Sequence, residues 1–227
     1  MKKRISFGIA FVCCVFGAVA AMAQMPAPRY PIKAYDGETI ANFDLNASLI
    51  ARLDKLAGKV PVGNLNGDVT LVQFYDLNCP YCREAAADID KLVRSDNKLK
   101  LVFVPYAVLS LESVRGAMIE IAAAKQLTPE QYLDFHRRIY ANRGMIDGAK
   151  VLAVAKDMGL DPQKLATAAN TESALDILRA NATFGGEAGL AATPAYVIDG
   201  VAIVGHPGLK PLQEVIRSVR ACGKVVC

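Results

Sequence analysis

Residues 69–82 read Val69-Thr70-Leu71-Val72-Gln73-Phe74-Tyr75-Asp76-Leu77-Asn78-Cys79-Pro80-Tyr81-Cys82. The first seven residues form an apolar run typical of a buried strand, and the alanine-rich stretch that follows favours a helix over residues 79–93. The two cysteines are therefore expected at the start of this helix. A helix N-terminus stabilises a thiolate on the first cysteine, and the second lies one turn further on, within disulfide reach. The pattern predicts a redox-active pair formed by Cys79 and Cys82.

Strands and helices alternate along the rest of the chain. Residues 99–104 are a second apolar run, so the order strand, helix, strand predicts a right-handed parallel unit. Residues 111–184 have helical spacing throughout. Two strand-like runs at residues 194–198 and 201–204 flank an Asp-Gly turn, which indicates a hairpin, and residues 208–220 have the spacing of a final helix. The chain is thus predicted to be an α/β protein with an all-helical insertion.

Residues 1–23 carry the pattern of a cleaved export signal. A basic start, Lys2-Lys3-Arg4, precedes an apolar stretch over residues 5–19 and a small-X-small site, Ala21-Met22-Ala23. A membrane anchor is the alternative interpretation, but the apolar stretch is short for a span. Cleavage removes three basic residues and no acidic ones, which lowers the net charge from +4 to +1. The composition of the remaining chain does not indicate a nucleic-acid partner.

Residues 24–60 are predicted to form an N-terminal arm and one helix. Several prolines interrupt the first part of this segment, and apolar spacing then favours a helix over residues 44–57, capped by Asn42 or Asp44. The apolar face of this helix is expected to pack either against the domain itself or against another subunit. Residues 61–221 are assigned to the main domain, which contains the helical insertion.

Four cysteines remain after removal of the signal segment, and two of them lie in a C-terminal tail at residues 222–227. An even number of cysteines in an exported chain suits disulfide bonds, because compartments outside the cytosol are oxidising. A local structural disulfide between Cys222 and Cys227 is the main prediction. A second redox pair that relays electrons, free thiols and intermolecular links are the alternatives. A zinc site shared by all four cysteines is a further alternative, which the oxidising compartment disfavours.

A second motif, Thr193-Pro194, stands immediately before the third predicted core strand. A proline at the start of a strand removes no hydrogen bond from the centre of the sheet. If the Thr193–Pro194 bond is cis, the backbone before the proline turns toward a neighbouring loop. An extended substrate segment could then pair with this backbone beside a disulfide.

Together, these features resemble the DsbA-like family of thioredoxin-fold thiol–disulfide oxidoreductases, which are bacterial envelope proteins. The matching parts are residues 69–82, residues 193–200 and the helical insertion, and the resemblance covers about residues 60–221. It implies a thioredoxin fold, a periplasmic location, no cofactor and no bound metal. Its implied clients are unfolded or folding envelope proteins with free cysteines, and a membrane or small-molecule redox partner resets the disulfide.

The resemblance also implies roles for single residues. Cys79 corresponds to the exposed nucleophile of the family and Cys82 to its buried partner, and these two cysteines form the redox-active disulfide. Pro194 corresponds to the cis proline of the family. The supporting residues are Pro80, Tyr81 and Thr193.

Three positions depart from the family pattern. The strongest oxidants of the family carry a histidine between the cysteines, where this chain has Tyr81, so we expect a less depressed Cys79 pKa and a milder oxidant. Family members often carry a buried glutamate at the position of Gln73, and an amide cannot relay a proton to the buried cysteine. Glycine is common at the position of Ala192, where the difference should matter less.

The predicted function is the introduction of disulfides into exported proteins by thiol–disulfide exchange through Cys79 and Cys82, and two other functions are the alternatives. One is a disulfide isomerase or reductase kept reduced; isomerases of the superfamily usually dimerise through an N-terminal extension. Another is an envelope metal-handling protein whose cysteine pair binds a soft cation such as copper. No methionine ligand lies close to this pair in the sequence, and Met118, Met145 and Met158 are expected on helices as core residues. A purely structural Cys79–Cys82 disulfide is disfavoured because its two-residue loop constrains little.

The two histidines of the chain are given no catalytic role. His136 is expected on the surface of a helix, and His206, in the turn at residues 205–208, is expected only to shape that loop.

Overall fold

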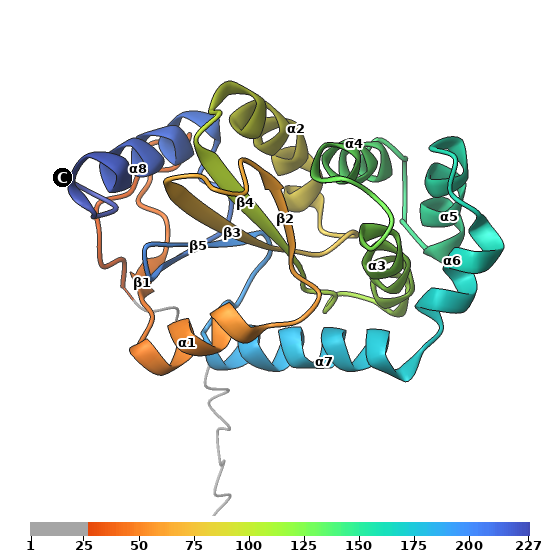
Figure 1. Ribbon diagram of the computed structural model, residues 1–227. Coiled ribbons are helices and arrows are strands. Elements are labelled where there is room, and N and C mark those ends of the chain that lie inside the picture. Colours follow the sequence, from red (N-terminus) through yellow and green to blue (C-terminus); the bar gives the residue numbers. More distant parts are fainter. Residues whose placement is uncertain (1–26) are drawn as a thin grey trace, which may run out of the picture.

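The computed structural model describes residues 27–227, so the predicted export signal lies outside the described residues. The core is one six-stranded sheet with the order β1-β6-β5-β3-β4-β2 (Figure 1). β3 and β4 are parallel, and α2 connects them, which gives the predicted strand–helix–strand unit. The strands are β1 (Asn42–Asp44), β2 (Val60–Gly63), β3 (Val69–Tyr75), β4 (Leu99–Pro105), β5 (Ala195–Ile198) and β6 (Val201–Val204).

The described residues contain eight helices, five of which form the predicted insertion between β4 and β5. The predicted insertion at 111–184 is slightly short, because the last of these helices continues to Glu187. Within residues 27–227, no helix has the length and hydropathy needed to cross a membrane. The helices are α1 (Ala47–Lys55), α2 (Pro80–Ser95), α3 (Leu111–Ala124), α4 (Pro129–Tyr140), α5 (Gly148–Asp157), α6 (Pro162–Ala169), α7 (Glu172–Glu187) and α8 (Leu209–Cys222).

Two edge strands were not predicted from the sequence. β1 pairs with β6 at one edge of the sheet, and β2 pairs with β4 at the other. The predicted caps for the N-terminal helix were wrong, because Asn42 and Asp44 both belong to β1. Asn46 caps α1 instead, and its side-chain oxygen accepts a hydrogen bond from the Leu49 N–H at 2.9 Å. Strands this short carry too few residues to show a period of two.

Helices cover both faces of the sheet, with α1 and α7 on one side and α2 and α8 on the other (Figure 1). Alternate residues of β3 serve the two sides: Phe74 packs with the α1 and α7 layer, and Tyr75 packs with the side that holds both cysteines. The apolar face of α1 contributes Leu53 to the first of these clusters. The apolar face of α1 therefore packs against the domain itself.

A buried polar cluster ties the insertion to β3, and it corrects the prediction for His136. This residue is only 3% exposed, and its Nδ1 lies 3.1 Å from Oε1 of the fully buried Glu120. The other carboxylate oxygen of Glu120 accepts a hydrogen bond from the Tyr75 hydroxyl at 3.0 Å, and the Tyr132 hydroxyl lies 3.2 Å from that of Tyr75. Because these groups come from α3, α4 and β3, the cluster fixes the strand that leads to the cysteines against two helices of the insertion.

The C-terminal tail is closed by a disulfide between Cys222 and Cys227, and Val225 inside this loop is buried in the core. Two residues before the disulfide, Arg220 pairs with Asp68, immediately ahead of β3. The tail therefore lies at the opposite end of β3 from Cys79, and a seven-residue strand spans about 23 Å. This separation excludes a zinc site shared by all four cysteines, and it favours a structural role for the tail disulfide over electron relay.

Candidate active site

Cys79 and Cys82 occupy the N-terminus of α2. Cys79 is the N-cap residue, with extended backbone, and its sulfur accepts a hydrogen bond from the Cys82 N–H at 3.4 Å. Pro80 takes the first helical position, where its missing N–H leaves no intrahelical bond unmade. Cys82 is one turn further on and is 1% exposed. Both cysteines are free thiols in the described structure.

The loop before β5 covers Cys79. The Thr193–Pro194 bond is cis, and the Thr193 carbonyl accepts a hydrogen bond from the Cys79 thiol at 3.0 Å. The resemblance implies an exposed Cys79, but this residue is only 4% exposed because the Thr193 loop lies against its sulfur. In contrast, the side chain of Tyr81 between the cysteines is open to solvent, with 64% of the residue exposed. The two motifs singled out in the sequence thus come together across 114 residues of chain.

The two sulfurs have opposite electrostatic settings. The Cys82 thiol, the Thr193 side chain and the N–H groups of Cys82 and Tyr81 can all donate hydrogen bonds to a Cys79 thiolate, and against the opposing effect of burial they lower its pKa to about 6. Burial raises the pKa of Cys82, and the neighbouring Cys79 sulfur raises it further. At neutral pH the reduced pair therefore consists of a Cys79 thiolate and a Cys82 thiol.

The Cys79 thiolate should titrate with a midpoint near pH 6, measured as the thiolate absorbance of the reduced protein at about 240 nm. Because the folded pKa lies below the ordinary value of 9.0, ionised Cys79 stabilises the folded, reduced protein fully above pH 9. That contribution is lost as the pH falls through about 6. Cys79→Ser should abolish the titration, and a midpoint near 9 in the unsubstituted protein would contradict this assignment.

The buried carboxylate of Asp76 holds the cysteine loop in place, a role not predicted from the sequence. Its Oδ1 accepts hydrogen bonds from the Asn78 N–H at 2.8 Å and from the Ser113 hydroxyl at 2.6 Å. Its Oδ2 accepts from the N–H groups of Val108 and Leu109 at 2.8 and 2.9 Å. The sequence signal for this role was an acidic residue directly after a core strand. Its hydrogen-bond partners could not be predicted, because most of them lie on segments that only the fold brings close to Asp76.

Two further side chains join the cysteine loop to the insertion. The Asn78 side chain donates to the Ile146 carbonyl at 2.9 Å and accepts from the Ile146 N–H at 2.7 Å. The guanidinium of Arg83, the residue after Cys82, donates to three carbonyl oxygens, that of Tyr140 at the end of α4 and those of Asn142 and Gly144 in the loop after it. The loops around the cysteines therefore form one hydrogen-bonded unit.

Exposed apolar side chains lie on these connected segments, in the first turns of α2 and α3 and in the loops after β4 and α4. Their exposed fractions range from 48% for Val108 to 69% for Leu111. Met145, predicted as a helical core residue, instead lies in the loop after α4 and is 58% exposed. Met118 and Met158 pack against the core as predicted. The five residues of this patch are Tyr81, Val108, Leu109, Leu111 and Met145.

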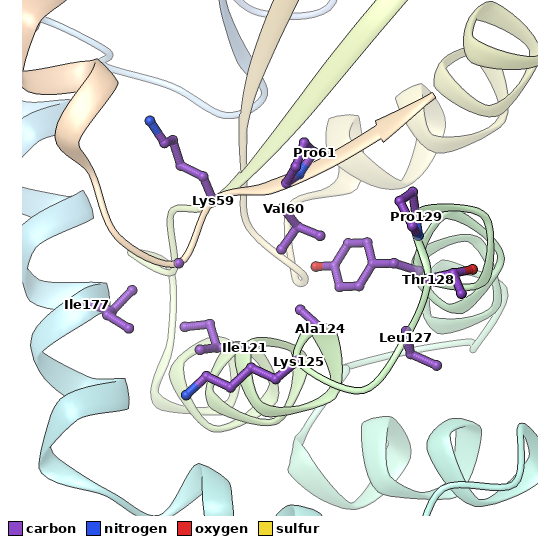
Figure 2. A pocket seen from close by; sticks show the side chains of 12 residues that line it. Lys59, Val60, Pro61, Ile121, Ala124, Lys125, Leu127, Thr128, Pro129 and Ile177 are labelled. Atoms are coloured by element: carbon purple, nitrogen blue, oxygen red, sulfur yellow. The ribbon is translucent and has the colours of Figure 1, made fainter. Parts of the chain in front are cut away.

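A cavity of about 390 Å³ lies elsewhere, between the start of β2 and helices α3, α4 and α7 (Figure 2). Its walls are mainly apolar and include Val60, Ile121, Ile177 and Tyr132. None of the predicted site residues lines this cavity. Within residues 27–227, no group of three or more metal-ligating side chains is arranged to hold a metal ion.

A thiol pair at a helix N-terminus, faced by a cis proline at the start of a sheet strand, defines the thiol–disulfide site of a thioredoxin fold. The family model described as Thioredoxin matches residues 55–218, and the chain belongs to this family. The fold, with its helical insertion, is the DsbA-like form that the sequence predicts. Among curated proteins, no match to the chain was found.

Solved structures of thiol–disulfide proteins superpose on most of the chain. A thioredoxin-like oxidoreductase from Silicibacter pomeroyi DSS-3 has a TM-score of 0.68 and 28% identity, covering 77% of this chain and 98% of its own. The thiol-disulfide exchange protein alpha-DsbA2 from Wolbachia pipientis has a TM-score of 0.68 and 22% identity, with coverages of 76% and 94%. The catalytic domain of ScsC from Proteus mirabilis has a TM-score of 0.68 and 22% identity, with coverages of 78% and 99%.

Proposed function

We propose that this protein is an enzyme, an exported thiol–disulfide oxidoreductase of the bacterial periplasm that introduces disulfides into folding envelope proteins. The observation that carries the proposal is the placement of Cys79 at the N-terminus of α2, where the Cys82 N–H donates to its sulfur beside the cis Thr193–Pro194 bond, with Cys82 buried one turn further on. This setting lowers the pKa of Cys79 to about 6 and raises the pKa of Cys82. A stabilised Cys79 thiolate favours the reduced pair, which makes the disulfide an acceptor of electrons from client thiols. The similar proteins from Silicibacter pomeroyi and Wolbachia pipientis are an oxidoreductase and a thiol-disulfide exchange protein, which supports the same chemistry for this chain.

The reaction proceeds by two exchanges at sulfur. A client thiolate attacks Cys79 of the oxidised pair, the Cys79–Cys82 bond breaks, and Cys82 leaves and takes up a proton. A second client thiolate then attacks the client sulfur of the mixed disulfide, and Cys79 leaves as a thiolate, which its low pKa favours. Two electrons pass from the client dithiol to the enzyme. A membrane or small-molecule redox partner takes these electrons and restores the disulfide.

The surroundings of Cys79 suit unfolded or folding clients with free cysteines. The exposed apolar patch consists of Tyr81 between the cysteines, Leu111 at the start of α3, and Val108, Leu109 and Met145 on the loops that are hydrogen-bonded to the cysteine loop. Unfolded chains expose apolar segments that such a patch can contact. The backbone of Thr193 lies directly beside the reactive sulfur and can pair with an extended client segment.

The reduction potential of the Cys79–Cys82 pair tests this function. The chain without residues 1–23 is titrated against glutathione, and its ability to oxidise a reduced, unfolded test protein is measured in parallel. We expect a potential between about −120 and −180 mV, the range of disulfide-introducing proteins, with Tyr81 placing it nearer the milder end. A potential near that of thioredoxin, about −270 mV, together with a reduced resting state in cells, would overturn the proposal in favour of a reductase.

A further inference from the structure

The loop that follows α4 is fixed to the cysteine segment on both sides of the redox pair. The side chain of Asn78, the residue before the first cysteine, donates to the Ile146 carbonyl at 2.9 Å and accepts from the Ile146 N–H at 2.7 Å. The guanidinium of Arg83, the residue after the second cysteine, donates to the Gly144 carbonyl at 3.0 Å. Met145 lies between the two anchored residues, so the loop runs past the cysteine segment in the opposite chain direction with Met145 at its centre.

Two cationic side chains hold the backbone of this loop. The acceptors alternate along the chain: Arg83 donates to the carbonyl groups of Tyr140, Asn142 and Gly144, and the Lys150 ammonium of α5 donates to those of Arg143 and Met145 at 2.7 and 2.6 Å. Gly144 has a φ of +68°, a left-handed backbone that glycine adopts without strain. The backbone on either side of Met145 is therefore fixed by hydrogen bonds from α2 and α5.

The side chain of Met145 is exposed although its backbone is fixed. This residue is 58% exposed, and Tyr81, between the cysteines, is 64% exposed. Removal of apolar surface from water is favourable, so an exposed methionine held beside a reactive disulfide suits contact with another polypeptide. A methionine side chain is unbranched, adapts to apolar partners of different shape and makes favourable contacts with aromatic rings. The chemistry of Met145 thus favours an apolar or aromatic partner side chain.

A client bonded to Cys79 places its neighbouring side chains near Met145. Asn78 adjoins Cys79 in the chain and bonds to Ile146, which adjoins Met145, so a single pair of hydrogen bonds joins the reactive position to the exposed methionine. Successive Cα atoms of a client are about 3.8 Å apart, so the residues one or two positions from its reacting cysteine lie within about 8 Å of that cysteine. Their side chains fall within reach of the long, unbranched side chain of Met145.

We propose that Met145 selects client thiols that stand next to an apolar or aromatic side chain, an inference that rests on the proposed function. The client thiolate attacks Cys79, the Cys79–Cys82 bond breaks, and Cys82 leaves and takes up a proton, while the neighbouring client side chain packs against the Met145 thioether. The contact favours the mixed disulfide, and it is released when the second client thiolate expels Cys79. Arg83 and Lys150 are positioning residues, because they act on the client only through the backbone that carries Met145.

Two dithiol peptides test the selection. They differ only in the residue before each cysteine, which is phenylalanine in one peptide and serine in the other. Each peptide is mixed with the oxidised protein, and reduction of the Cys79–Cys82 disulfide is followed by acid quenching, alkylation and mass measurement. After correction for the thiolate fraction of each peptide, we expect the phenylalanine peptide to react about 10-fold faster, the effect of a sulfur–aromatic contact near the upper end of its usual range.

Substitutions of Met145 assign this preference to its side chain. Met145→Ala should lower the ratio of the two rates to about twofold, and Met145→Leu, which keeps an apolar side chain, should retain most of it. Reduction by dithiothreitol, which carries no neighbouring side chain, should be unchanged in both variants. Leu65→Ala is the matched control and should leave the ratio unchanged, because Leu65 is 46% exposed in the turn before β3, at the other end of that strand from the cysteines.

Arg83→Met tests the positioning, because it removes three donated hydrogen bonds and keeps an unbranched side chain. It should lower the ratio as Met145→Ala does, and it should have no further effect on the ratio when Met145→Ala is already present. A residue that only supports the fold would instead change the rates with both peptides and with dithiothreitol by the same factor. If Arg83→Met fails to fold, Lys150→Met, which releases the loop from the side of α5, gives the same test.

The outcomes separate this inference from the proposed function. Equal rates for the two peptides, or a ratio that Met145→Ala leaves unchanged, would overturn the role of Met145, while oxidation of both peptides would leave the proposed function intact. An unchanged ratio in Arg83→Met would overturn the positioning role. If the oxidised protein reacts with neither peptide nor with dithiothreitol, the proposed function itself fails, and the selection fails with it.

Discussion

Cys82→Ser is expected to trap client proteins as stable mixed disulfides on Cys79. The variant keeps the Cys79 sulfur at the helix N-terminus, where backbone N–H groups and the Thr193 side chain favour the thiolate. A Cys79 thiolate that attacks a client disulfide then has no neighbouring thiol to release it. The adducts should appear on non-reducing gels of cells that express the variant, disappear on reduction, and identify the clients by mass spectrometry.

Two controls separate the roles of the sulfurs. Cys79→Ser should yield no adducts and should reduce client oxidation to the uncatalysed rate, because the buried Cys82 presents no accessible thiolate. Paired replacement of Cys222 and Cys227 by serine should leave trapping by Cys82→Ser unchanged, since the tail disulfide lies at the other end of β3. Equal trapping by Cys79→Ser would reverse the assignment of nucleophile and partner.

Asp76→Ala should produce the largest loss of stability among substitutions near the site. The change removes a fully buried carboxylate that accepts four hydrogen bonds, and it leaves the donors on Asn78, Ser113, Val108 and Leu109 without their acceptor. A buried donor left unpaired costs about 1–3 kcal/mol, and of the four donors Ser113 is buried while the other three are part-buried, so we expect the free energy of unfolding to fall by about 3 kcal/mol. Urea denaturation of the oxidised protein measures this difference.

Asp90→Asn is the matched control for this experiment. Asp90 lies on the cysteine helix α2 itself, but its partner is Arg94 four residues further along the same helix, a pair of the kind that contributes about 0.3–0.5 kcal/mol. A loss of the same size in both variants would show that Asp76 has no special structural role. Asp76→Asn is expected to fall close to Asp76→Ala, because an amide offers one acceptor oxygen in place of two and directs its own donors at the N–H groups.

The sequence predicted the parts of the fold that depend on neighbouring residues. The run at residues 69–75 and the helix after it are local patterns, and β3 has the bounds that were predicted. The capping box of Thr128 and Gln131 at the start of α4 is a local pattern of the same kind, since the groups involved are three residues apart. The edge strand β2, by contrast, has only four residues, and its pairing with β4 is what makes it a strand.

The candidate site divides in the same way. Cys79, Cys82 and Pro194 could be singled out because each belongs to a short motif with a chemical meaning. Three other features could not be predicted, because each depends on contacts between distant segments. They are the burial of Cys79, the polar cluster around His136, and the hydrogen bonds of His206 with Tyr196 and Asp88. A histidine within a helical sequence carries no sign of which side chain it will meet, and Glu120, the partner of His136, lies on another helix.

The anchoring of the cysteine loop has a consequence for chimeric proteins. Asp76, Asn78 and Arg83 lie between the end of β3 and the first turn of α2, whereas Ser113, Ile146 and Tyr140, to which they are hydrogen-bonded, lie in the insertion. Excising the insertion would therefore leave a buried carboxylate and a guanidinium without their partners. Likewise, transplanting residues 76–83 into a smaller thioredoxin scaffold would carry over the sulfurs without the groups that hold them. The helical insertion is thus an inseparable part of the catalytic scaffold, and the two should unfold as one cooperative unit.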